Sequence, residues 1–550
     1  MSPILECVPN FSEGRDPGII KQITDQIESV AGVRLLNVDP GKATNRTVVT
    51  FVGPPEAVIE AAFLAISKAG EVIDMRTHKG EHPRMGATDV CPLIPIAGIS
   101  MEETAAWARR LAERVGGELQ IPVYLYEAAQ PDKRRSNLSV IRAGEYEGFF
   151  KKILLPEWKP DFGPAEFHAR RGGTVIGARD FLVAYNVNLN TTSTRRANAI
   201  AFDVREAGRV IKEGDKDVQV PGTLKSVKAI GWYIEEYGIA QISMNLTNIR
   251  VTPVHVAFDE VCRAAGERGI RVTGSELVGL IPLQAMLDAG RYFLEKQQRS
   301  TGVSEKELIR IAILSMGLDE LGTFKPEERI IEYQLREAAA DRLVKMDLND
   351  FADETASESP APGGGSIAAY VGALGAALGT MVANLSAHKK GWDDRWREFS
   401  DWADKGQRYK DELLRLVDAD TRAFNGIMAA FALPKGSEAE KKIRQEAIRQ
   451  ATRTAIEVPF RVMEAADSSF ALIRAMAAEG NPNSVSDAGV GALCARAAVL
   501  GAFLNVRINA KGYSDKGYVR EVLTRGEALV EKAMAAEKDI LTIVNEKIAM

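Results

Sequence analysis

The chain changes character near Pro326, and this change constrains the fold more than any other feature of the sequence. Before it, short runs rich in Val, Ile, Phe and Tyr alternate with amphipathic stretches, which is typical of strands interleaved with helices. After it, strand-like runs disappear, and Ala-rich helical stretches are interrupted at 361–366, 433–437 and 480–484. We therefore predict an α+β N-terminal half and an all-α C-terminal domain.

The order of elements predicts the topology of the N-terminal half. Residues 4–69 follow the order β-α-β-β-α, and a similar order recurs over residues 181–268. This pattern indicates a split βαβ unit, so we expect two ferredoxin-like α/β sandwich subdomains with a cleft between them. The predicted domains are two subdomains at 1–178 and 179–325, a linker at 326–345 and a helical domain at 346–550.

Composition excludes several classes of function. The net charge of −5 argues against nucleic acid as the main partner. Four scattered cysteines without a CxxC motif suit reduced thiols, and the N-terminus has no basic segment before an apolar run, so we expect a cytoplasmic protein. Residues 366–388 carry no Asp, Glu, Lys or Arg, but they are rich in Ala, Gly and Ser, which favours a buried helix over a membrane span.

Two of the five histidines, His78 and His82, lie close together in one stretch. Gly80 and Pro83 interrupt what would otherwise be helical spacing, so we predict a loop. Because a loop histidine exchanges protons near neutral pH, His82 is the candidate general acid/base. The alternatives are a solvated or capping histidine and a metal ligand. We predict no metal, because the HExxH order is absent and no Cys/His cluster lies nearby.

Four further features have both a functional and a structural interpretation. Asp39 ends a predicted strand, where it would meet the histidine loop or simply close an Asx turn. Asp418 and Asp420 lie on a predicted helix. Either both are solvated, or one of them points into a pocket and has a raised pKa. The stretch at 156–173, with its basic cluster of His168, Arg170 and Arg171, is a linker or a loop that binds a polycarboxylate. The turn at 362–366 binds a ligand or allows close helix packing.

Several long strings resemble one family. They are ECVPNFSEGR at 6–15, NRTVVTFVGPPE at 45–56 and HKGEHPRMGATDVCP at 78–92, followed by APGGGS, LVDADTRAFN and NSVSDAGVGA in the helical part. Together they resemble the formiminotransferase-cyclodeaminase family of bifunctional folate enzymes in histidine degradation. The resemblance spans nearly the whole chain.

The resemblance implies a reaction and a set of residues. The first module would move a formimino group from N-formimino-L-glutamate to tetrahydrofolate, and the second would close the ring to 5,10-methenyl-tetrahydrofolate and release ammonia. The implied catalytic residues are His82, Asp39 and Asp420. The implied substrate-binding residues are Arg268, Gly163, Pro164, Ala165, Glu166, Phe167, His168, Ala169, Arg170, Arg171, Gly172, Gly363, Gly364, Gly365 and Ser366.

The resemblance also implies partners. Tetrahydrofolate would be a co-substrate, with no tightly bound cofactor and no metal, and the chain would form a homo-oligomer, an octamer in the family. Two other functions stay open from the sequence: a glutamate formyltransferase fused to a methenyl-tetrahydrofolate cyclohydrolase, and a non-catalytic folate-binding or scaffold protein. The length of the folate's glutamate tail and transfer of intermediate between the modules also stay open.

Overall fold

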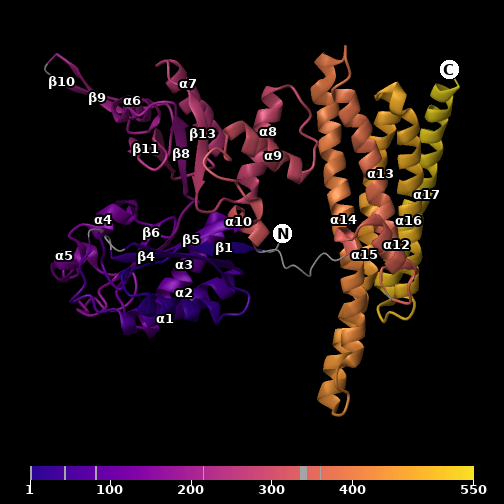
Figure 1. The fold of residues 1–550 in the computed structure, drawn as a ribbon. Coiled ribbons are helices and arrows are strands. Elements are labelled where there is room, and N and C mark those ends of the chain that lie inside the picture. The colour runs from indigo at the N-terminus through magenta and orange to yellow at the C-terminus, as the bar shows by residue number, and fades with distance from the viewer. Residues whose placement is uncertain are drawn as a thin grey trace. The chain divides into compact units, whose positions relative to one another are not determined.

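The computed structural model describes residues 3–41, 45–80, 83–214, 216–334, 343–359 and 361–549. The chain divides into two compact units (Figure 1). The first comprises Met1–Ala285 with Met316–Leu335, and the second comprises Met286–Ser315 with Arg336–Met550. The segment Met286–Ser315 therefore packs with the helical unit, although it precedes the predicted linker.

The first sandwich is built on a mixed sheet with its long helices on one face. Its elements are β1 (Ile4–Cys7), β2 (Asn10–Phe11), α1 (Pro17–Glu28), β3 (Arg34–Gly41), β4 (Arg46–Gly53), α2 (Pro55–Val72), β5 (Thr88–Ala97), α3 (Met101–Glu118), β6 (Val123–Glu127) and β7 (Thr174–Ala178). The strands β5, β1, β4 and β3 lie side by side and antiparallel, which confirms the ferredoxin-like prediction. The parallel strands β7 and β6 extend the sheet beyond β5.

Strand β5 was not predicted from the sequence. It contains Pro92 and Pro95, and proline has no backbone N–H to donate to a neighbouring strand. The sheet accommodates Pro92 through its carbonyl, whose oxygen accepts the amide of Val8 at 3.2 Å, and Pro95 lies opposite Leu5 of β1. The short elements η1 (Lys133–Arg135), α4 (Leu138–Arg142), α5 (Glu145–Lys152) and η2 (Pro156–Trp158) lie between β6 and β7.

The second sandwich repeats the arrangement of the first. Its elements are β8 (Val183–Leu189), α6 (Thr194–Val204), β9 (Arg209–Glu213), β10 (Lys216–Val220), β11 (Val227–Ile234), β12 (Ile239–Leu246), α7 (Val254–Gly266) and β13 (Val272–Val278). The order β11-β12-β8-β13 corresponds to β3-β4-β1-β5, so the predicted second sandwich is also confirmed. The hairpin β9–β10 and the strand β13 were not predicted.

The second unit is helical, as the sequence predicts. Its helices are α8 (Leu283–Lys296), α9 (Glu305–Met316), α12 (Leu348–Ala356), α13 (Gly364–Ala387), α14 (Trp396–Ala432), α15 (Glu438–Glu479), α16 (Val485–Ala510) and α17 (Lys516–Ile548), of which α8 and α9 cross the unit boundary. The short helices α10 (Pro326–Arg329), α11 (Ile331–Gln334), η3 (Leu343–Lys345), η4 (Asp393–Arg395) and η5 (Pro482–Ser484) cap or connect longer elements. Figure 1 shows α13 to α17 as long, roughly parallel rods.

Small residues allow α13 to lie in the middle of this bundle, where it packs against α14, α15 and α16. A Cβ on Gly375 would lie 2.9 Å from the carbonyl oxygen of Gly491, so the two helices approach at a distance that no side chain permits. By length and composition, Gly364–Ala387 and Pro482–Ala510 could cross a membrane, but both are packed in the bundle. The prediction of a buried helix at 366–388 is therefore confirmed.

Candidate active sites

Asn45 anchors the loop that carries the histidine pair. Its Nδ2 donates to the carbonyl of Lys79 at 3.1 Å, and its Oδ1 accepts the amide of Gly14 at 3.0 Å. Asn45 has a φ of 48°, a left-handed conformation that asparagine adopts more readily than most residues. His82, the predicted general acid/base, lies outside the described residues, so its role stays a prediction. The hydrogen bond from Asn45 to Lys79 holds the part of the loop that precedes His82 at the start of β4.

His78 is fixed in one tautomer. Arg84 donates its Nε–H to the Nδ1 atom of His78 at 3.2 Å, so Nδ1 accepts, and Nε2 carries the proton and faces the carbonyl of Asn45 at 2.8 Å. Burial lowers the pKa of His78, and the positive charge of Arg84 acts in the same direction. His78 is thus a neutral, hydrogen-bonded anchor. No feature of the sequence separates the structural role of His78 from the role predicted for His82.

Arg84 itself is buried and ties the loop to α5. Its guanidinium binds Glu147 in bidentate fashion, at 2.6 and 2.8 Å, and reaches Glu145 at 3.2 Å. A cavity of about 480 Å³ opens beside this pair and is lined by Lys79, Gly80, Arg84, Gly144, Glu145 and Glu147. The ion pairs between Arg84 and the two glutamates attach the loop to α5.

Asp39 lies exposed on β3, opposite Val48 of β4. Burial and the positive charge of Arg142 lower the pKa of Arg46, whereas the negative charges of Asp89 and Asp39 raise it. Asp89 is fully buried and accepts the Met85 amide at 3.0 Å and the Arg142 guanidinium. Burial raises the pKa of Asp89. Asp39 therefore belongs to a charge network next to Asn45, and among the described residues it makes no hydrogen bond or ion pair with the histidine loop.

A cleft of about 750 Å³ lies beside this network, within the first unit. It is lined from both sandwiches by Asn10, Val90, Pro92, Met101, Tyr126, Glu127, Ala128, Asn137, Leu138, Ser139, Arg142, Ala178, Arg179, Asp180, Leu182, Lys228, Thr247 and Asn248. Three of these side chains are cations, and Lys228 makes no ion pair with any residue that the structure describes. The cleft is large enough for a small organic substrate, and its cations suit carboxylates.

Glu6 is a buried acid on β1, with 3% of its surface exposed. Its neighbours Leu5 and Cys7 point into the core under the helices, so alternation along the strand places Glu6 on the opposite face of the sheet. Burial raises the pKa of Glu6 to about 7, and the cleft residue Arg179 offsets part of that increase. The sequence places Glu6 within a family motif but gives no sign of its burial.

The predicted substrate loop, residues 163–172, is held by its own basic and aromatic side chains. Arg170 donates to the carbonyl of Glu71 at 2.5 Å, and Arg171 donates to the carbonyl of Leu119 at 3.0 Å, so each cation lies at the end of a helix. The ring of Phe167 packs against Tyr146, Phe149 and Phe150. These arginines stabilise the loop, and its substrate-binding role stays a prediction.

Arg268 does not line the cleft. It follows α7 and forms an ion pair with Asp203 of α6, and the same carboxylate also binds Arg209. Both helices cover one face of the second sheet. The structure thus gives Arg268 a structural partner and does not bring it together with Asp39. Lys228 and Arg179 are the basic side chains that point to the cleft from this part of the chain.

In the helical unit, the predicted turn and the predicted acid do meet. The hydroxyl of Ser366, at the start of α13, shares its proton between two acceptors on α14, the carbonyl of Val417 at 2.9 Å and Asp420 Oδ2 at 3.1 Å. A Cβ on Gly365 would lie 2.3 Å from Asp420 Oδ1, so only glycine leaves room for the carboxylate. Burial raises the pKa of Asp420, while the Ser366 hydroxyl and amide partly offset the increase.

The second acid of the motif has a different task. Asp418 is buried and accepts the amides of Leu343 at 3.0 Å and Val344 at 3.4 Å, so it holds the segment that leads into the helical unit. Asn505 of α16 lies beside Gly364, about 3.4 Å from where a Cβ would stand. Sequence inspection did not find Asn505, because nothing in its neighbourhood along the chain points to Gly364.

Among the side chains that the structure describes, no three His, Cys, Asp or Glu residues are grouped as a metal site. The first module instead has a cleft lined by three cations, which suits an anionic substrate, and the second has a partly buried carboxyl whose pKa is raised. The chain thus combines two modules, each with the features of an enzyme that acts on small molecules.

Comparison with known proteins identifies the family. The formiminotransferase domain, N-terminal subdomain, matches residues 4–179, the formiminotransferase domain matches 184–336, and formiminotransferase-cyclodeaminase matches 347–528. The formimidoyltransferase-cyclodeaminase of Gallus gallus is 43% identical over 549 residues, which is 100% of both chains. The chain belongs to the formiminotransferase-cyclodeaminase family, as its motifs predict.

Relatives of the separate modules also exist. The glutamate formimidoyltransferase of Thermoplasma acidophilum is 44% identical over 294 residues, covering 53% of this chain and 92% of that protein. The methenyltetrahydrofolate cyclohydrolase of Methylorubrum extorquens is 36% identical over 201 residues, covering 36% of this chain and 97% of that protein. Each of these two relatives therefore corresponds to one part of the chain.

Proposed function

We propose that this chain transfers the formimino group of N-formimino-L-glutamate to nitrogen 5 of tetrahydrofolate and then cyclises the product to 5,10-methenyl-tetrahydrofolate with release of ammonia. The observation that carries this proposal is the full-length match to a formimidoyltransferase-cyclodeaminase, which includes both modules. The contact between Ser366 and Asp420 supports it independently, because it provides a proton-transfer group in the second module.

In the first reaction, nitrogen 5 attacks the amidine carbon and loses a proton, and the leaving glutamate amine gains one. A single base with a pKa near 7 serves both steps, and we assign this role to His82 by resemblance. Asp39 would stabilise the charged form of the histidine. Arg268 would clamp a substrate carboxylate by resemblance, but because it is paired with Asp203, we propose that Lys228 and Arg179 contribute to this binding.

In the second reaction, nitrogen 10 is already tethered to the reacting carbon, so the substrate itself provides proximity. The enzyme must then move a proton from nitrogen 10 toward the departing ammonia. Asp420 suits this task because burial raises its pKa and the Ser366 hydroxyl fixes its orientation. We propose that the turn at 363–366 binds the folate next to this carboxyl.

The co-substrate, assembly and location complete the proposal. Tetrahydrofolate enters as a co-substrate, and we propose that no cofactor is tightly bound and that the enzyme is cytoplasmic. We also propose a homo-oligomer, an octamer by resemblance. Its support is the apolar surface of the bundle, where Leu504 and Ile508 on α16 are 63% and 69% exposed and Leu374, Met381 and Leu385 line α13.

The test is a pair of assays on purified protein supplied with N-formimino-L-glutamate and tetrahydrofolate. Ammonia and the absorbance of the methenyl product are followed in wild type, His82→Ala and Asp420→Asn, with Asp401→Asn as an exposed control on the same helix. We expect His82→Ala to form neither product and Asp420→Asn to accumulate the 5-formimino intermediate. Full activity of His82→Ala would disprove its assignment.

A second candidate keeps the fold and changes the reaction. The cyclohydrolase of Methylorubrum extorquens matches the helical part, so the chain could join formyl transfer to methenyl-tetrahydrofolate cyclohydrolase activity. Exchange of a formimino nitrogen for oxygen is a small change in the substrate. If wild type released no ammonia from formimino-glutamate but transferred formyl from N-formyl-glutamate, this second function would replace the first.

A further inference from the structure

A short segment upstream of α9 is inserted between α13 and α14. Ser300 and Thr301 are 1% and 5% exposed, although Glu295 to Arg299 just before them are exposed. The segment lies within the range matched by the transferase domain, 184–336, yet it packs with the helical unit. The contact therefore joins a piece of one module to the body of the other.

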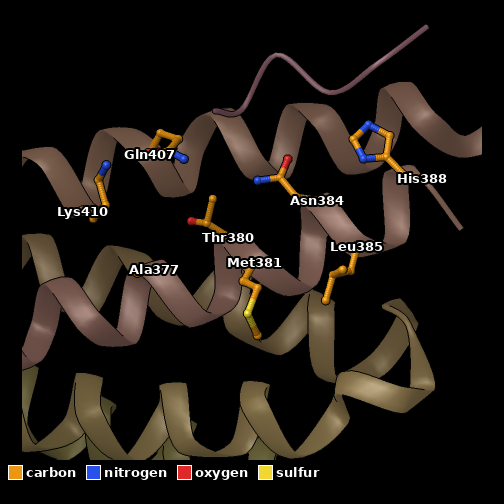
Figure 2. A pocket seen from close by; sticks show the side chains of 8 residues that line it. All are labelled: Ala377, Thr380, Met381, Asn384, Leu385, His388, Gln407 and Lys410. Carbon is orange, nitrogen blue, oxygen red and sulfur yellow. The ribbon is translucent and has the colours of Figure 1, made fainter. Parts of the chain in front are cut away.

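The groove recognises the backbone of this segment. The amide of Ser300 donates to His388 Nε2 at 3.1 Å, and the amide of Thr301 donates to the Ser400 hydroxyl at 3.0 Å. The carbonyl of Gly302 accepts two side-chain amides, from Asn384 at 2.9 Å and Gln407 at 3.1 Å. Figure 2 shows Asn384, His388 and Gln407 together beside a cavity of about 440 Å³.

The groove also selects side chains. The Thr301 hydroxyl donates to Asp404 Oδ2 at 3.0 Å. A Cβ on Gly302 would lie 2.3 Å from the Cβ of Ala403, so no residue larger than glycine fits. On α14, Ser400, Ala403, Asp404 and Gln407 are spaced three, four and seven residues apart, which places them on one face of the helix. Threonine followed by glycine is therefore the sequence that this groove fits.

Two buried side-chain oxygens of the groove have no hydrogen-bond partner among the described residues. Because both Nδ2 of Asn384 and Nε2 of Gln407 face the Gly302 carbonyl, their orientations are fixed, and Asn384 Oδ1 and Gln407 Oε1 are buried without a hydrogen-bond partner among the described residues. A buried polar atom without a hydrogen-bond partner destabilises the state that buries it. This effect opposes docking, so the segment is held less firmly than its number of contacts suggests.

We infer that residues 300–302 form a reversible docking joint, in which the transferase segment occupies a Thr-Gly-selective groove between α13 and α14. The joint ties the two modules together through contacts away from Asp420. On α13 it begins 18 residues after Ser366, or roughly 27 Å along the helix at 1.5 Å per residue. It can therefore open and close without disturbing the Asp420 site. This inference does not depend on which group the enzyme transfers.

Limited trypsin digestion of the full chain tests the joint, because Arg299 adjoins the buried residues and cleavage after it requires the segment to leave the groove. The variants are Gly302→Val, which cannot fit, and Asn384→Leu/Gln407→Leu, which removes both donors. Gly322→Val is the matched control, since nothing lies within 4 Å of a Cβ there. Mass spectrometry identifies the cleavage sites, and hydrogen exchange of peptides spanning 297–303 measures the opening of the joint.

We expect both variants to be cleaved after Arg299 roughly tenfold faster than wild type and the control, with faster exchange at 297–303. Cleavage after Lys410, within α14, should not change. An unchanged rate after Arg299 in both folded variants would show that these contacts do not hold the segment. A parallel rise after Lys410 would also overturn the inference, because the segment would then be part of the bundle core and no separable joint would exist.

Discussion

The Ser366 hydroxyl donates a hydrogen bond to the Asp420 carboxylate across 3.1 Å, and the two residues lie 54 positions apart in the chain. The bond joins the first turn of α13 to the middle of α14. Burial favours the neutral acid, whereas the hydrogen bonds from the Ser366 hydroxyl and amide favour the charged carboxylate. Because burial is the larger of the two effects at Asp420, its pKa is raised, which a proton-transfer group requires.

Gly365→Ala should impair the second reaction and spare the first. The added methyl group would meet Asp420 Oδ1 at 2.3 Å, so the carboxylate must move, at an overpacking cost of about 1–3 kcal/mol. We expect ammonia release to fall by roughly tenfold or more. Gly426→Ala on α14 is the control, because nothing lies within 4 Å of its Cβ. Normal ammonia release by Gly365→Ala would contradict the placement of the site.

Ser366→Ala should shift the pH dependence of the cyclodeaminase step. Its hydroxyl lowers the pKa of Asp420, so removal raises that pKa further. The acid limb of the rate profile, where Asp420 must lose its proton, should move to higher pH. The rate of ammonia release is measured across pH in this variant and in Ser468→Ala, an exposed serine on α15. A profile that loses amplitude without moving would mean that Ser366 acts only on structure.

Asp420→Asn should stabilise the fold while it blocks the second step. The folded pKa of Asp420 is raised from 3.8, so its favourable contribution is complete below pH 3.8 and is lost as pH rises through the folded value. At pH 8 the wild type bears the cost of a buried charge that the amide avoids. Calorimetry should give a higher Tm for the variant at pH 8. A lower Tm would show that the charged carboxylate is stabilised by more than Ser366.

Glu6→Gln should also stabilise the protein, with a pH window of its own. Burial raises the pKa of Glu6 from 4.5 to about 7, so its contribution is complete below pH 4.5 and is lost as pH rises through about 7. The variant should therefore gain stability on the order of 3 kcal/mol at pH 8 and less than about 1 kcal/mol at pH 5. Urea unfolding at both pH values measures the difference. Equal gains at pH 5 and pH 8 would exclude the ionisation of Glu6 as the cause.

Lys228→Met should weaken binding of anionic substrate in the first module. Lys228 lines the cleft without an ion pair among the described residues, so its charge is available to a carboxylate. We expect KM for formimino-glutamate to rise roughly threefold to tenfold with little change in kcat, and the effect should shrink at high salt. Lys212→Met, on the exposed β9–β10 hairpin, is the control. An unchanged KM would remove Lys228 from the binding site.

The fold could be predicted because helices and strands impose different periods on apolar residues, and both sandwiches show them in the same order. Strand β5 escaped prediction because Pro92 and Pro95 mark turns in most sequences, and β13 escaped because Gly274 interrupts it. In the structure, β5 pairs with β1 and β7 although it contains both prolines. Local patterns do not contain this information, since it depends on which backbone lies alongside.

The sites were predictable to the extent that motifs contain them. The family resemblance placed the 363–366 turn and Asp420 in the same module and implied Asp420 as the catalytic acid. The residue pattern alone could not tell Asp418 from Asp420, because two residues on a helix differ by about 200° in direction and only packing decides which one faces α13. The buried pair of Asp89 and Arg142 was not found at all, since 53 residues separate them. Contacts of that range follow from the assembled fold.

The hydrogen bonds that fix the ring of His78 also determine how the loop responds to chemical labelling. An electrophile that acylates imidazole needs a free nitrogen lone pair, and the single lone pair of neutral His78 is already directed at Arg84. Within this loop, labelling should therefore report on His82 alone. The same holds for titration: with its pKa lowered, His78 stays neutral as the solution is acidified past the point where an ordinary histidine takes up a proton. His78 should therefore neither react nor titrate in the range of an ordinary histidine, and a reactivity profile of the loop should show a single histidine.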